Sequence, residues 1–364
     1  MAKSQNKNLH KAKQGKNDEF YTQLCDIENE LRHYKEHFRG KTVLCNCDDP
    51  RISNFFHYFT YNFEHLGLKK LITTCYKNQD MELFSTNNSE RAIYLEYEGG
   101  KVGNDSTVPL VEDIGIQYLK GDGDFRSAEC IELLKQADIV VTNPPFSLFR
   151  EYVSQLVQHD KKFLIIGSKN VITYKEIFQL IKENKLWVGM MPMSLDILFD
   201  VPDYVAQELL KNGNLGSNYK LVNGIVKGRS TSVWFTNLDH NKRYEDLILY
   251  KKYTPEEYPH YDNYDAINVD KTKDIPCDFT GAMGVPITFL DKYNPEQFEI
   301  MGQGQGNLYR ELTPNGLTQK FVDDYYANGG KGSIKEDHPV LGYYDNNGKA
   351  IIPYMRIIIR NKRI

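Results

Sequence analysis

The alternation of short apolar segments with amphipathic segments between residues 24 and 237 constrains the fold more than any other feature. The apolar segments are four to eight residues long, which is typical of buried strands. The expected strands are 42–46, 71–76, 116–119, 139–142, 163–166, 186–190 and 230–237, and the expected helices are 24–38, 51–65, 127–136, 148–158 and 174–184. This order predicts an α/β fold with a mostly parallel sheet flanked by helices, and ligands of such sheets bind at the carboxyl ends of the strands.

The composition changes near residue 240, beyond which tyrosine, proline, asparagine and glycine are frequent and helical periods are few. With 364 residues, the chain is long enough for about two domains. We therefore predict a basic flexible arm at 1–17, a catalytic domain at 18–240 and a region rich in strands and loops at 241–364.

Positive charge is concentrated at the two ends of the chain. Residues 1–16 carry +5 and residues 356–364 carry +4, whereas the whole chain carries −4, so residues 17–355 carry −13. A polyanion would therefore meet attractive charge mainly at the ends. The residues that we expect to contact phosphates are Lys7, Lys11, Lys13, Lys16, Arg360 and Lys362. A solubilising tail that contacts nothing is an equally good interpretation of the N-terminal lysines.

Neither export nor membrane insertion is indicated. The longest apolar runs are far shorter than the roughly 20 residues that a helix needs to cross a bilayer, and no apolar segment follows the lysine-rich start. Six cysteines without the spacing of a small disulfide-bonded domain suit a reducing compartment. We expect a cytoplasmic protein, and a monomer is compatible with the sequence.

We expect no metal site. His33, Glu36 and His37 have the spacing of a zinc peptidase motif, but both histidines fall on the side of the expected helix opposite its apolar face, where they would be solvated. Cys45 and Cys47 point the same way in a strand but have no further ligands nearby in the sequence.

The strongest chemical signal is Asn143-Pro144-Pro145-Phe146, which follows the expected strand 139–142 and precedes a helix. Each proline restricts the residue before it to an extended backbone, so the strand ends in a stiff loop whose acceptors have fixed directions. A diproline turn that only joins strand to helix is the alternative. The position at the carboxyl end of a strand favours a functional loop.

Such a loop carries the groups that methylation of a planar amino group requires. The lone pair of that nitrogen is delocalised into the ring until two acceptors draw its N–H bonds out of plane. The side-chain oxygen of Asn143 and the carbonyl of Pro144 are candidates for these acceptors. Phe146 offers a face on which a base can stack, an interaction worth about 1–3 kcal/mol.

At this motif the chain resembles amino-methyltransferases that use S-adenosylmethionine, and longer runs are similar to the EcoRI-type adenine-specific DNA methyltransferases. The runs are Asp18-Glu-Phe-Tyr-Thr-Gln23, Cys45-Asn-Cys-Asp-Asp-Pro50, Gly121-Asp-Gly-Asp-Phe-Arg126, Thr142-Asn-Pro-Pro-Phe-Ser-Leu-Phe-Arg-Glu-Tyr152, Tyr261-Asp-Asn-Tyr-Asp-Ala-Ile-Asn268 and Met283-Gly-Val-Pro-Ile-Thr-Phe289. The resemblance covers most of residues 10–300 and the basic C-terminal end.

The resemblance implies a class I methyltransferase-like fold with S-adenosylmethionine as cofactor. The cofactor-binding residues that it implies are Phe20, Tyr21, Thr22, Cys45, Asn46, Asp48, Asp122, Asp124 and Phe125. Segment 45–49 departs from the usual glycine-rich cofactor loop because it contains no glycine, which leaves open whether Asn46, Asp48 or Asp49 contacts the methionine part. By itself, Gly121-Asp-Gly-Asp124 also fits a simple turn or a divalent metal site, although its place at a strand end favours the cofactor.

The resemblance further implies a site-specific DNA adenine methyltransferase from a restriction–modification system, with Asn143, Pro144, Pro145 and Phe146 as catalytic residues. The adenine must be flipped out of duplex DNA before its amino group can be reached. Asn143 cannot act as a base, so the proton is expected to leave to water after methyl transfer. Residues 241–364, together with 190–230, are expected to recognise the target. Two alternatives stay open, a methyltransferase of RNA or protein glutamine and a DNA-binding regulator without activity.

Overall fold

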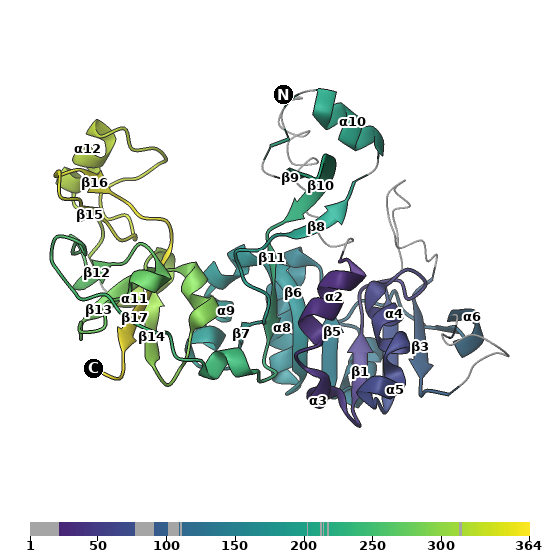
Figure 1. Ribbon diagram of the computed structural model, residues 1–364. Coiled ribbons are helices and arrows are strands. Elements are labelled where there is room, and N and C mark those ends of the chain that lie inside the picture. The colour runs from purple at the N-terminus through teal and green to yellow at the C-terminus, as the bar shows by residue number, and fades with distance from the viewer. Residues whose placement is uncertain are drawn as a thin grey trace. The chain divides into compact units, whose positions relative to one another are not determined.

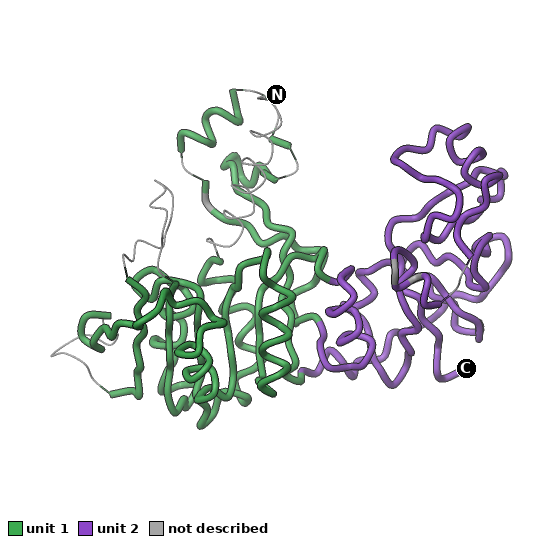
Figure 2. The backbone as a smooth tube through the Cα atoms, turned by 180° about the vertical axis from the view of Figure 1, so that it is seen from behind, with its two compact units in different colours: residues 1–171, 188–239 green, residues 172–187, 240–364 purple. Residues whose placement is uncertain are grey.

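The computed structural model describes residues 22–76, 91–100, 109, 111–201, 203–211, 213, 215–216, 218–312 and 315–364. The chain divides into two compact units (Figure 2). The first unit comprises Met1–Val171 and Val188–Asp239, and the second comprises Ile172–Trp187 and His240–Ile364. The domain boundary predicted near residue 240 agrees with the start of the larger part of the second unit. It does not account for residues 172–187, which belong to the second unit although they lie within the α/β pattern.

A sheet of eight strands, counted over the described residues, forms the framework of the first unit. The strand order is β4-β3-β2-β1-β5-β6-β11-β7 (Figure 1). The strands are β1 (Thr42–Cys45), β2 (Lys70–Cys75), β3 (Ile93–Tyr97), β4 (Gln117–Tyr118), β5 (Ile139–Thr142), β6 (Lys162–Ser168), β7 (Trp187–Val188) and β11 (Ser232–Thr236). The central strands β2, β1, β5 and β6 pair in parallel, whereas β3, β4 and β11 pair in antiparallel fashion. The predicted α/β fold is confirmed.

The strand order changes direction between β1 and β5, which are neighbours in the sheet. From β1 the chain passes to β2 on one side, and from β5 it passes to β6 on the other. Such a switch point leaves a crevice outside the carboxyl ends of the two strands, where open α/β sheets bind their ligands. Asn46 and Asn143 are the residues that follow these two strands.

Helices from the N-terminal part of the chain cover one face of this sheet. They are α2 (Leu24–Leu31), α3 (Lys35–Phe38), α4 (Asn54–Tyr61) and α5 (Phe63–Leu66). Their buried apolar residues share one core with alternate residues of the strands, such as Val43 and Cys45 of β1. Helices α7 (Ala128–Gln136) and α8 (Phe149–Gln158) pack against β1 and β6. Ser53 and Ser127 cap α4 and α7 by accepting a backbone N–H three residues later.

Two helices expected to be continuous are broken. The helix expected at 24–38 is α2 followed by α3, because residues 32–34 form a tight turn in which the backbone N–H of Tyr34 donates to Leu31 O over 2.9 Å. The helix expected at 51–65 is α4 followed by α5, with the break at Asn62. Apolar periodicity continues across both breaks, so the sequence pattern could not locate them. Gly67, with a φ of 62°, ends α5 in the left-handed region.

A small sheet is inserted between β7 and β11. Its strands are β8 (Ile197–Asp200), β9 (Tyr219–Val222) and β10 (Ile225–Ser230). Over the described residues they form an antiparallel sheet in the order β8-β10-β9, and α10 (Asp203–Lys211) connects β8 to β9 along the chain. Asn223 and Gly224, with φ values of 51° and 80°, form the two-residue hairpin turn. Strand β10 runs directly into β11, whose first residue pairs with Ser168 at the carboxyl end of β6. The inserted sheet therefore leaves the main sheet at its carboxyl edge (Figure 1).

The second unit is built on a mostly antiparallel sheet with the order β12-β13-β17-β14 over its described residues. The elements are α9 (Lys175–Lys182), β12 (Ala266–Asn268), β13 (Ala282–Pro286), β14 (Phe298–Gln303), α11 (Gly306–Leu312), α12 (Gln319–Ala327), β15 (Tyr343–Tyr344), β16 (Ala350–Ile351) and β17 (Arg356–Asn361). The C-terminal strand is thus a central strand. Helices α11 and α12 were not expected from the few helical periods of this region. Among the described helices, none has the length and apolar character that crossing a bilayer requires.

Candidate active site

The Asn-Pro-Pro-Phe loop leaves the carboxyl end of β5 and enters α8 through a short 3-10 turn at Phe146–Leu148. The side chain of Asn143 is buried, and its Nδ2 donates a hydrogen bond to Thr22 Oγ1 over 3.3 Å. Phe146 is half-buried and packs against the core that α2 and α4 share with the sheet. The loop is therefore held from the N-terminal side by Thr22, which the sequence places at the cofactor.

The loop after β1 lies beside the Asn-Pro-Pro-Phe loop. The Thr142 hydroxyl donates to the backbone carbonyl of Asn46, and Tyr152 from α8 donates to Asn46 Oδ1 over 2.5 Å. Cys47 has a φ of 85°, in the left-handed region that favours glycine. Cys47 thus makes the turn that glycine makes in a glycine-rich loop.

The three candidates for the methionine contact in this loop have different environments. Asp49 is buried and accepts both arms of the Arg51 guanidinium, over 2.9 Å and 2.6 Å. Asn46 is buried and is oriented by Tyr152. Asp48 is half-buried, and its Oδ2 accepts from Ser53 Oγ over 3.4 Å. Of the two carboxylates, that of Asp48 is therefore more accessible than that of Asp49.

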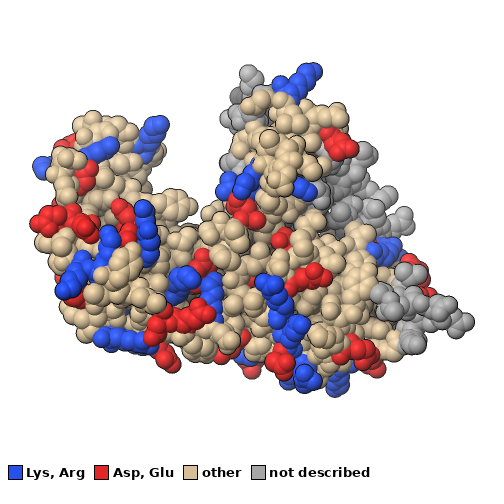
Figure 3. Space-filling model, viewed as in Figure 1, with Lys and Arg blue, Asp and Glu red and all other residues tan. Residues whose placement is uncertain are grey.

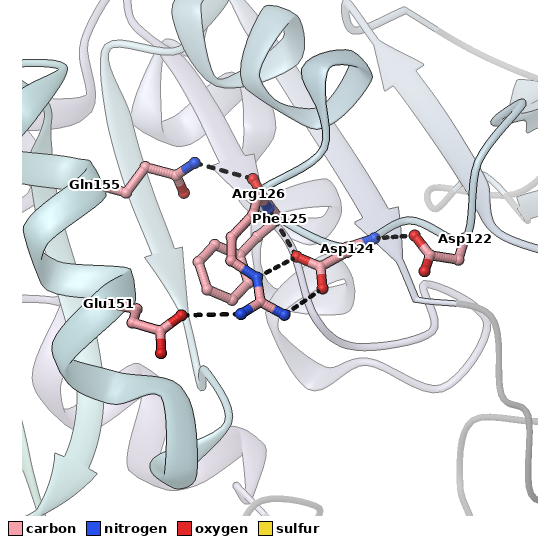
Figure 4. Close-up of polar contacts among 6 residues, drawn as sticks. All are labelled: Asp122, Asp124, Phe125, Arg126, Glu151 and Gln155. Atoms are coloured by element: carbon pink, nitrogen blue, oxygen red, sulfur yellow. Dashed lines mark hydrogen bonds and ion pairs between the residues drawn. The ribbon is translucent and has the colours of Figure 1, made fainter.

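The Gly-Asp-Gly-Asp turn is fixed to the start of α8 (Figure 4). Asp122 Oδ1 accepts the backbone N–H of Asp124 over 3.0 Å, and Asp124 in turn accepts Nε and NH2 of Arg126 over 2.9 Å and 2.7 Å. Arg126 also donates to Glu151 of α8 over 2.9 Å. On the other side of the turn, Gln155 Nε2 donates to the carbonyl of Phe125 over 3.1 Å. The helix that follows the catalytic loop therefore also positions this turn.

Glycine is required at one position of this turn because the turn packs against the end of β2. Gly123 has a φ of 81°, and a Cβ there would lie 2.5 Å from the carbonyl oxygen of Cys75. The close approach places the carboxylates of Asp122 and Asp124 near Tyr76, and burial and these two charges raise the pKa of Tyr76. The ends of β1, β2 and β5 and the 121–126 turn thus converge at one edge of the sheet.

The electrostatics of the site favour neutral phenols and an ionised carboxylate. Hydrogen bonds from Arg126 hold the pKa of Asp124 below its ordinary value. Burial raises the pKa of Tyr152 well above its ordinary value, so its hydroxyl stays protonated and donates to Asn46. The ring of Phe125 lies edge-on against that of Tyr152, with centroids 5.0 Å apart. This arrangement offers fixed oxygen acceptors and an aromatic ring, which suit a cationic ligand with a planar base.

The structure connects some of the site residues expected from the sequence. Hydrogen bonds and ring contacts link Thr22 to Asn143, and they link Asn46 through Tyr152 to Phe125. Phe20 and Tyr21 lie outside the described residues, as do Lys7, Lys11, Lys13 and Lys16. Sequence reasoning missed Arg51, Arg126, Glu151, Tyr152 and Gln155. The spacing of the last three on the helix after the motif was the available signal, because residues three and four apart share one helix face.

The basic C-terminal end lies in the second unit and is partly engaged with acids. Arg356 is buried and pairs with Asp270 over 3.2 Å, and Arg363 pairs with Asp246 over 2.6 Å. Arg360 is exposed, and Lys362 Nζ donates to the carbonyl of Pro295 over 2.9 Å. On the face shown in Figure 3, basic and acidic side chains are interspersed. Whether Arg360 and Lys362 contact phosphates stays a prediction.

The two histidines with the spacing of a zinc peptidase motif, His33 and His37, contact different groups in the structure. His33 is exposed and accepts from Arg32 Nε over 3.3 Å, and His37 Nε2 lies 2.8 Å from the carbonyl oxygen of Asp239. Within the described part of the chain, no three or more His, Cys, Asp or Glu side chains gather as metal ligands would.

The fold and the site together define the class of the protein. A mostly parallel sheet with the Asn-Pro-Pro-Phe loop at its switch point agrees with the fold that the resemblance to amino-methyltransferases implies. Residues 8–362 match the family described as Adenine-specific methyltransferase EcoRI, and the chain belongs to this family. The predicted resemblance is confirmed.

Individual relatives agree with this assignment. The chain is 52% identical over 325 residues to the type II methyltransferase M.EcoRI of Escherichia coli, a match that covers 87% of the chain and 95% of the relative. It is 41% identical over 301 residues to the type II methyltransferase M.MgeORF184P of Mycoplasma genitalium, covering 80% of the chain and 85% of the relative. It is also 41% identical over 299 residues to the type II methyltransferase M.MpnI of Mycoplasma pneumoniae, covering 80% and 84%. No solved structure matches the chain significantly.

Proposed function

We propose that the protein is a site-specific DNA adenine methyltransferase, the modification enzyme of a restriction–modification system, with S-adenosylmethionine as cofactor. One observation carries the proposal. The buried amide of Asn143 stands at the switch point of the sheet, at the end of β5, in a chain that belongs to an adenine-specific methyltransferase family. Type II methyltransferases as relatives support DNA as the substrate.

The residues at the carboxyl edge suit S-adenosylmethionine, which carries an ammonium group, a sulfonium and an adenine ring. In our proposal, Asp48 and Asn46 hold the methionine part, with Cys45 and Thr22 beside it and Phe20 and Tyr21 closing over it. The carboxylates of Asp122 and Asp124 accept the adenine amino group, and Phe125 covers the ring. When bound, the cofactor supplies the methyl group and leaves as a neutral thioether, so the protein has to supply alignment and exclusion of water.

The Asn-Pro-Pro-Phe loop then prepares the amino group of adenine. The base, flipped out of the duplex, stacks on Phe146, and its two amino hydrogens are accepted by Asn143 Oδ1 and by the carbonyl of Pro144. Because Asn143 Nδ2 donates to Thr22 Oγ1, the amide is oriented with its oxygen as the acceptor for the substrate. Pro145 keeps the carbonyl of Pro144 in its direction. The proton leaves to water after the methyl has transferred.

Recognition of the DNA is assigned to other segments. We infer that the inserted sheet within 190–230 and residues 241–364 read the target bases, and that residues 18–240 form the catalytic domain. The lysines of the arm at 1–17, with Arg360 and Lys362, contact phosphates. Such contacts position the protein on the duplex without reading its sequence.

A labelling experiment tests the proposal. The protein is incubated with methyl-labelled S-adenosylmethionine and a mixture of duplex DNA, RNA and protein, and the label is located by hydrolysis and chromatography. We expect it on the amino group of adenine in the duplex, at one short sequence. Label on RNA or on glutamine would instead establish the alternative substrates. If no label transfers and calorimetry detects no cofactor binding, the protein is a DNA-binding regulator.

A further inference from the structure

Helix α2 carries a buried carboxylate that the proposed reaction does not use. The side chain of Glu30 has no exposed surface, yet it lies among the apolar residues Ile27 and Leu31. Its Oε1 accepts the backbone N–H of Met190 over 2.7 Å, and its Oε2 accepts the backbone N–H of Met191 over 2.7 Å. Tyr34 adds a hydrogen bond to Oε1 over 2.9 Å. A buried carboxylate is costly unless hydrogen bonds compensate it, so these contacts constrain both partners.

The peptide that Glu30 holds is the root of the inserted sheet. Residues 189–191 follow β7 directly and precede β8, so they form one of the two connections between the inserted sheet and the main sheet, the other being the passage from β10 into β11. Gly189 pairs with β11 through a hydrogen bond from its N–H to Trp234 O over 2.9 Å. A Cβ at position 189 would lie 2.3 Å from Glu30 Oε1 and 2.7 Å from Trp234 Cβ. The root is therefore clamped between α2 and β11 with no room for a side chain.

The segment just before the same helix contacts the Asn-Pro-Pro-Phe loop. Thr22 precedes α2 by two residues, and its hydroxyl accepts from Asn143 Nδ2. Its backbone carbonyl also accepts from Asn54 Nδ2 of α4 over 2.8 Å, which ties this end of α2 to the neighbouring helix. Phe146, Met190 and Met191 all pack against the core to which α2 contributes. Helix α2 and the residue two positions before it thus contact both the root of the inserted sheet and the Asn-Pro-Pro-Phe loop.

We propose that Glu30 is a positioning residue that sets the inserted sheet relative to the Asn-Pro-Pro-Phe loop, so that contacts of the insertion with DNA present the correct base to Asn143. Glu30 touches neither substrate nor cofactor. It acts through the backbone of Met190 and Met191, and α2 is the rigid spacer between recognition and chemistry. The part of this inference that concerns DNA rests on the proposed function.

The test uses the full chain with Glu30→Gln. A glutamine has a single acceptor oxygen, so its amide NH₂ must face one of the two backbone N–H groups, and the clamp on the root is lost at nearly unchanged volume. We expect the single-turnover rate of methylation at the target site to fall about tenfold. At sites that differ by one base pair the rate should fall less, so the ratio between target and near-target sites falls at least about threefold. Affinity for S-adenosylmethionine, measured by calorimetry, should stay within twofold.

Two further variants act on the same clamp. Tyr34→Phe removes the hydrogen bond from Tyr34 to Glu30 and should give a smaller change of the ratio in the same direction. Gly189→Ala places a methyl group against Glu30 Oε1 and should reproduce the effect of Glu30→Gln. Asp138→Asn is the matched control, because Asp138 also accepts a backbone N–H, that of Thr42 over 2.8 Å, but at the amino edge of the sheet. It should leave the ratio unchanged.

A merely structural role for Glu30 would lower the melting temperature and the fraction of active protein, but not the ratio of rates per active molecule. A folded Glu30→Gln variant whose ratio is that of the wild type overturns the proposal. Hydrogen exchange separates this failure from a failure of the proposed function. Even if the wild type methylates no DNA, the variant should exchange faster at Met190 and Met191 and in β8–β10, with α8 unchanged. Unchanged exchange at these amides also overturns the proposal.

Discussion

The two units use polar side chains in different places. In the first unit, the four residues of β1 and of β5 are all buried, and the polar groups Asn46 and Asn143 follow the last residue of each strand. In the second unit, polar groups lie inside the sheet: Arg356 of β17 donates to Asn268 of β12 over 3.1 Å, and Tyr261 donates to the same oxygen over 2.9 Å.

This difference suggests that the polar groups of the first sheet serve ligand binding and catalysis, whereas those of the second sheet serve stability. Groups that follow parallel strands are not needed to join the strands, so they are available to a ligand. Groups within a mixed sheet, such as Asn268 and Arg356, compensate one another, and the sheet depends on them. Substitutions at the edge of the first sheet should therefore cost activity, whereas substitutions within the second should cost stability. The first two of the five predictions below test this division directly.

The largest effect is expected for Asn143→Ala. It removes an acceptor used at the reacting nitrogen, and loss of one such fixed group typically lowers turnover by about 10²–10³-fold. Affinity for S-adenosylmethionine should stay within a few fold, since in our proposal Asn143 contacts the substrate base and not the cofactor. Rapid-quench methylation and calorimetry measure the two quantities. A variant with full turnover would reduce the motif to a simple turn.

Arg356→Met should show the opposite pattern. It removes the buried guanidinium that donates to Asn268 and pairs with Asp270, and we expect the second unit to lose about 2 kcal/mol of stability in urea unfolding. Cofactor binding by the first unit should be unchanged. Arg360→Met, on the same strand but exposed, is the control and should change stability by less than about 0.5 kcal/mol. Equal effects of the two substitutions would contradict a structural role for Arg356.

Deleting residues 1–16 compares the two basic ends. The N-terminal lysines should contact phosphates, so the deletion should weaken binding to all DNA sequences about tenfold and flatten the plot of log K against log salt by about 0.9 for each lost contact. The methylated site should stay the same. At the C-terminal end, Arg356 and Arg363 already pair with acids, which leaves Arg360 and Lys362 as the candidates for phosphate contacts. Substituting these two residues by Gln should therefore flatten the slope less than the deletion does. An unchanged slope after the deletion would identify the arm as a solubility feature.

Tyr152→Phe tests whether α8 organises the cofactor loop. The substitution leaves the ring but removes the hydroxyl that donates to Asn46, a bond whose loss typically costs about 1 kcal/mol. We expect affinity for S-adenosylmethionine to fall about fivefold by calorimetry, with the methylated site unchanged. Tyr58→Phe, on α4, is a control of the same chemistry. Wild-type affinity in Tyr152→Phe would show that Asn46 needs no support from α8.

The smallest effect concerns the pH dependence of Asp124. Its pKa in the folded protein is lowered by Arg126, so the ionised form stabilises the folded state above the ordinary value of 3.8, and this contribution is lost as pH falls through the lowered value. Because Arg126 is exposed and Asp124 is only half-buried, Asp124→Asn should lower the melting temperature at pH 7 by only about 2 °C. The difference from the wild type should shrink below pH 4. A difference that grows with acid would contradict the lowered pKa.

The sequence by itself determined the central strands β1, β2, β5 and β6 of the first unit and the position of the Asn-Pro-Pro-Phe loop, whereas β3 and the three strands of the inserted sheet were not expected. The central strands are short apolar runs, and a strand followed by two prolines leaves little conformational freedom, so local composition was sufficient for 139–146. The family resemblance rested on the same runs and is confirmed.

Only the tertiary structure decided how distant residues meet. The turn at residues 32–34 interrupts a helix whose apolar period continues, and beside this turn the carboxylate of Glu30 binds both Tyr34 and a peptide 160 residues away. The hydrogen bond from Tyr152 to Asn46 likewise joins residues that are far apart in the sequence. Arg356 belongs to a basic terminal run in the sequence, yet it lies buried and donates to Asn268. Periodicity describes the faces of single helices and strands, whereas these contacts depend on which helices and strands become neighbours. The tertiary packing of the helices on the sheet determines these neighbours.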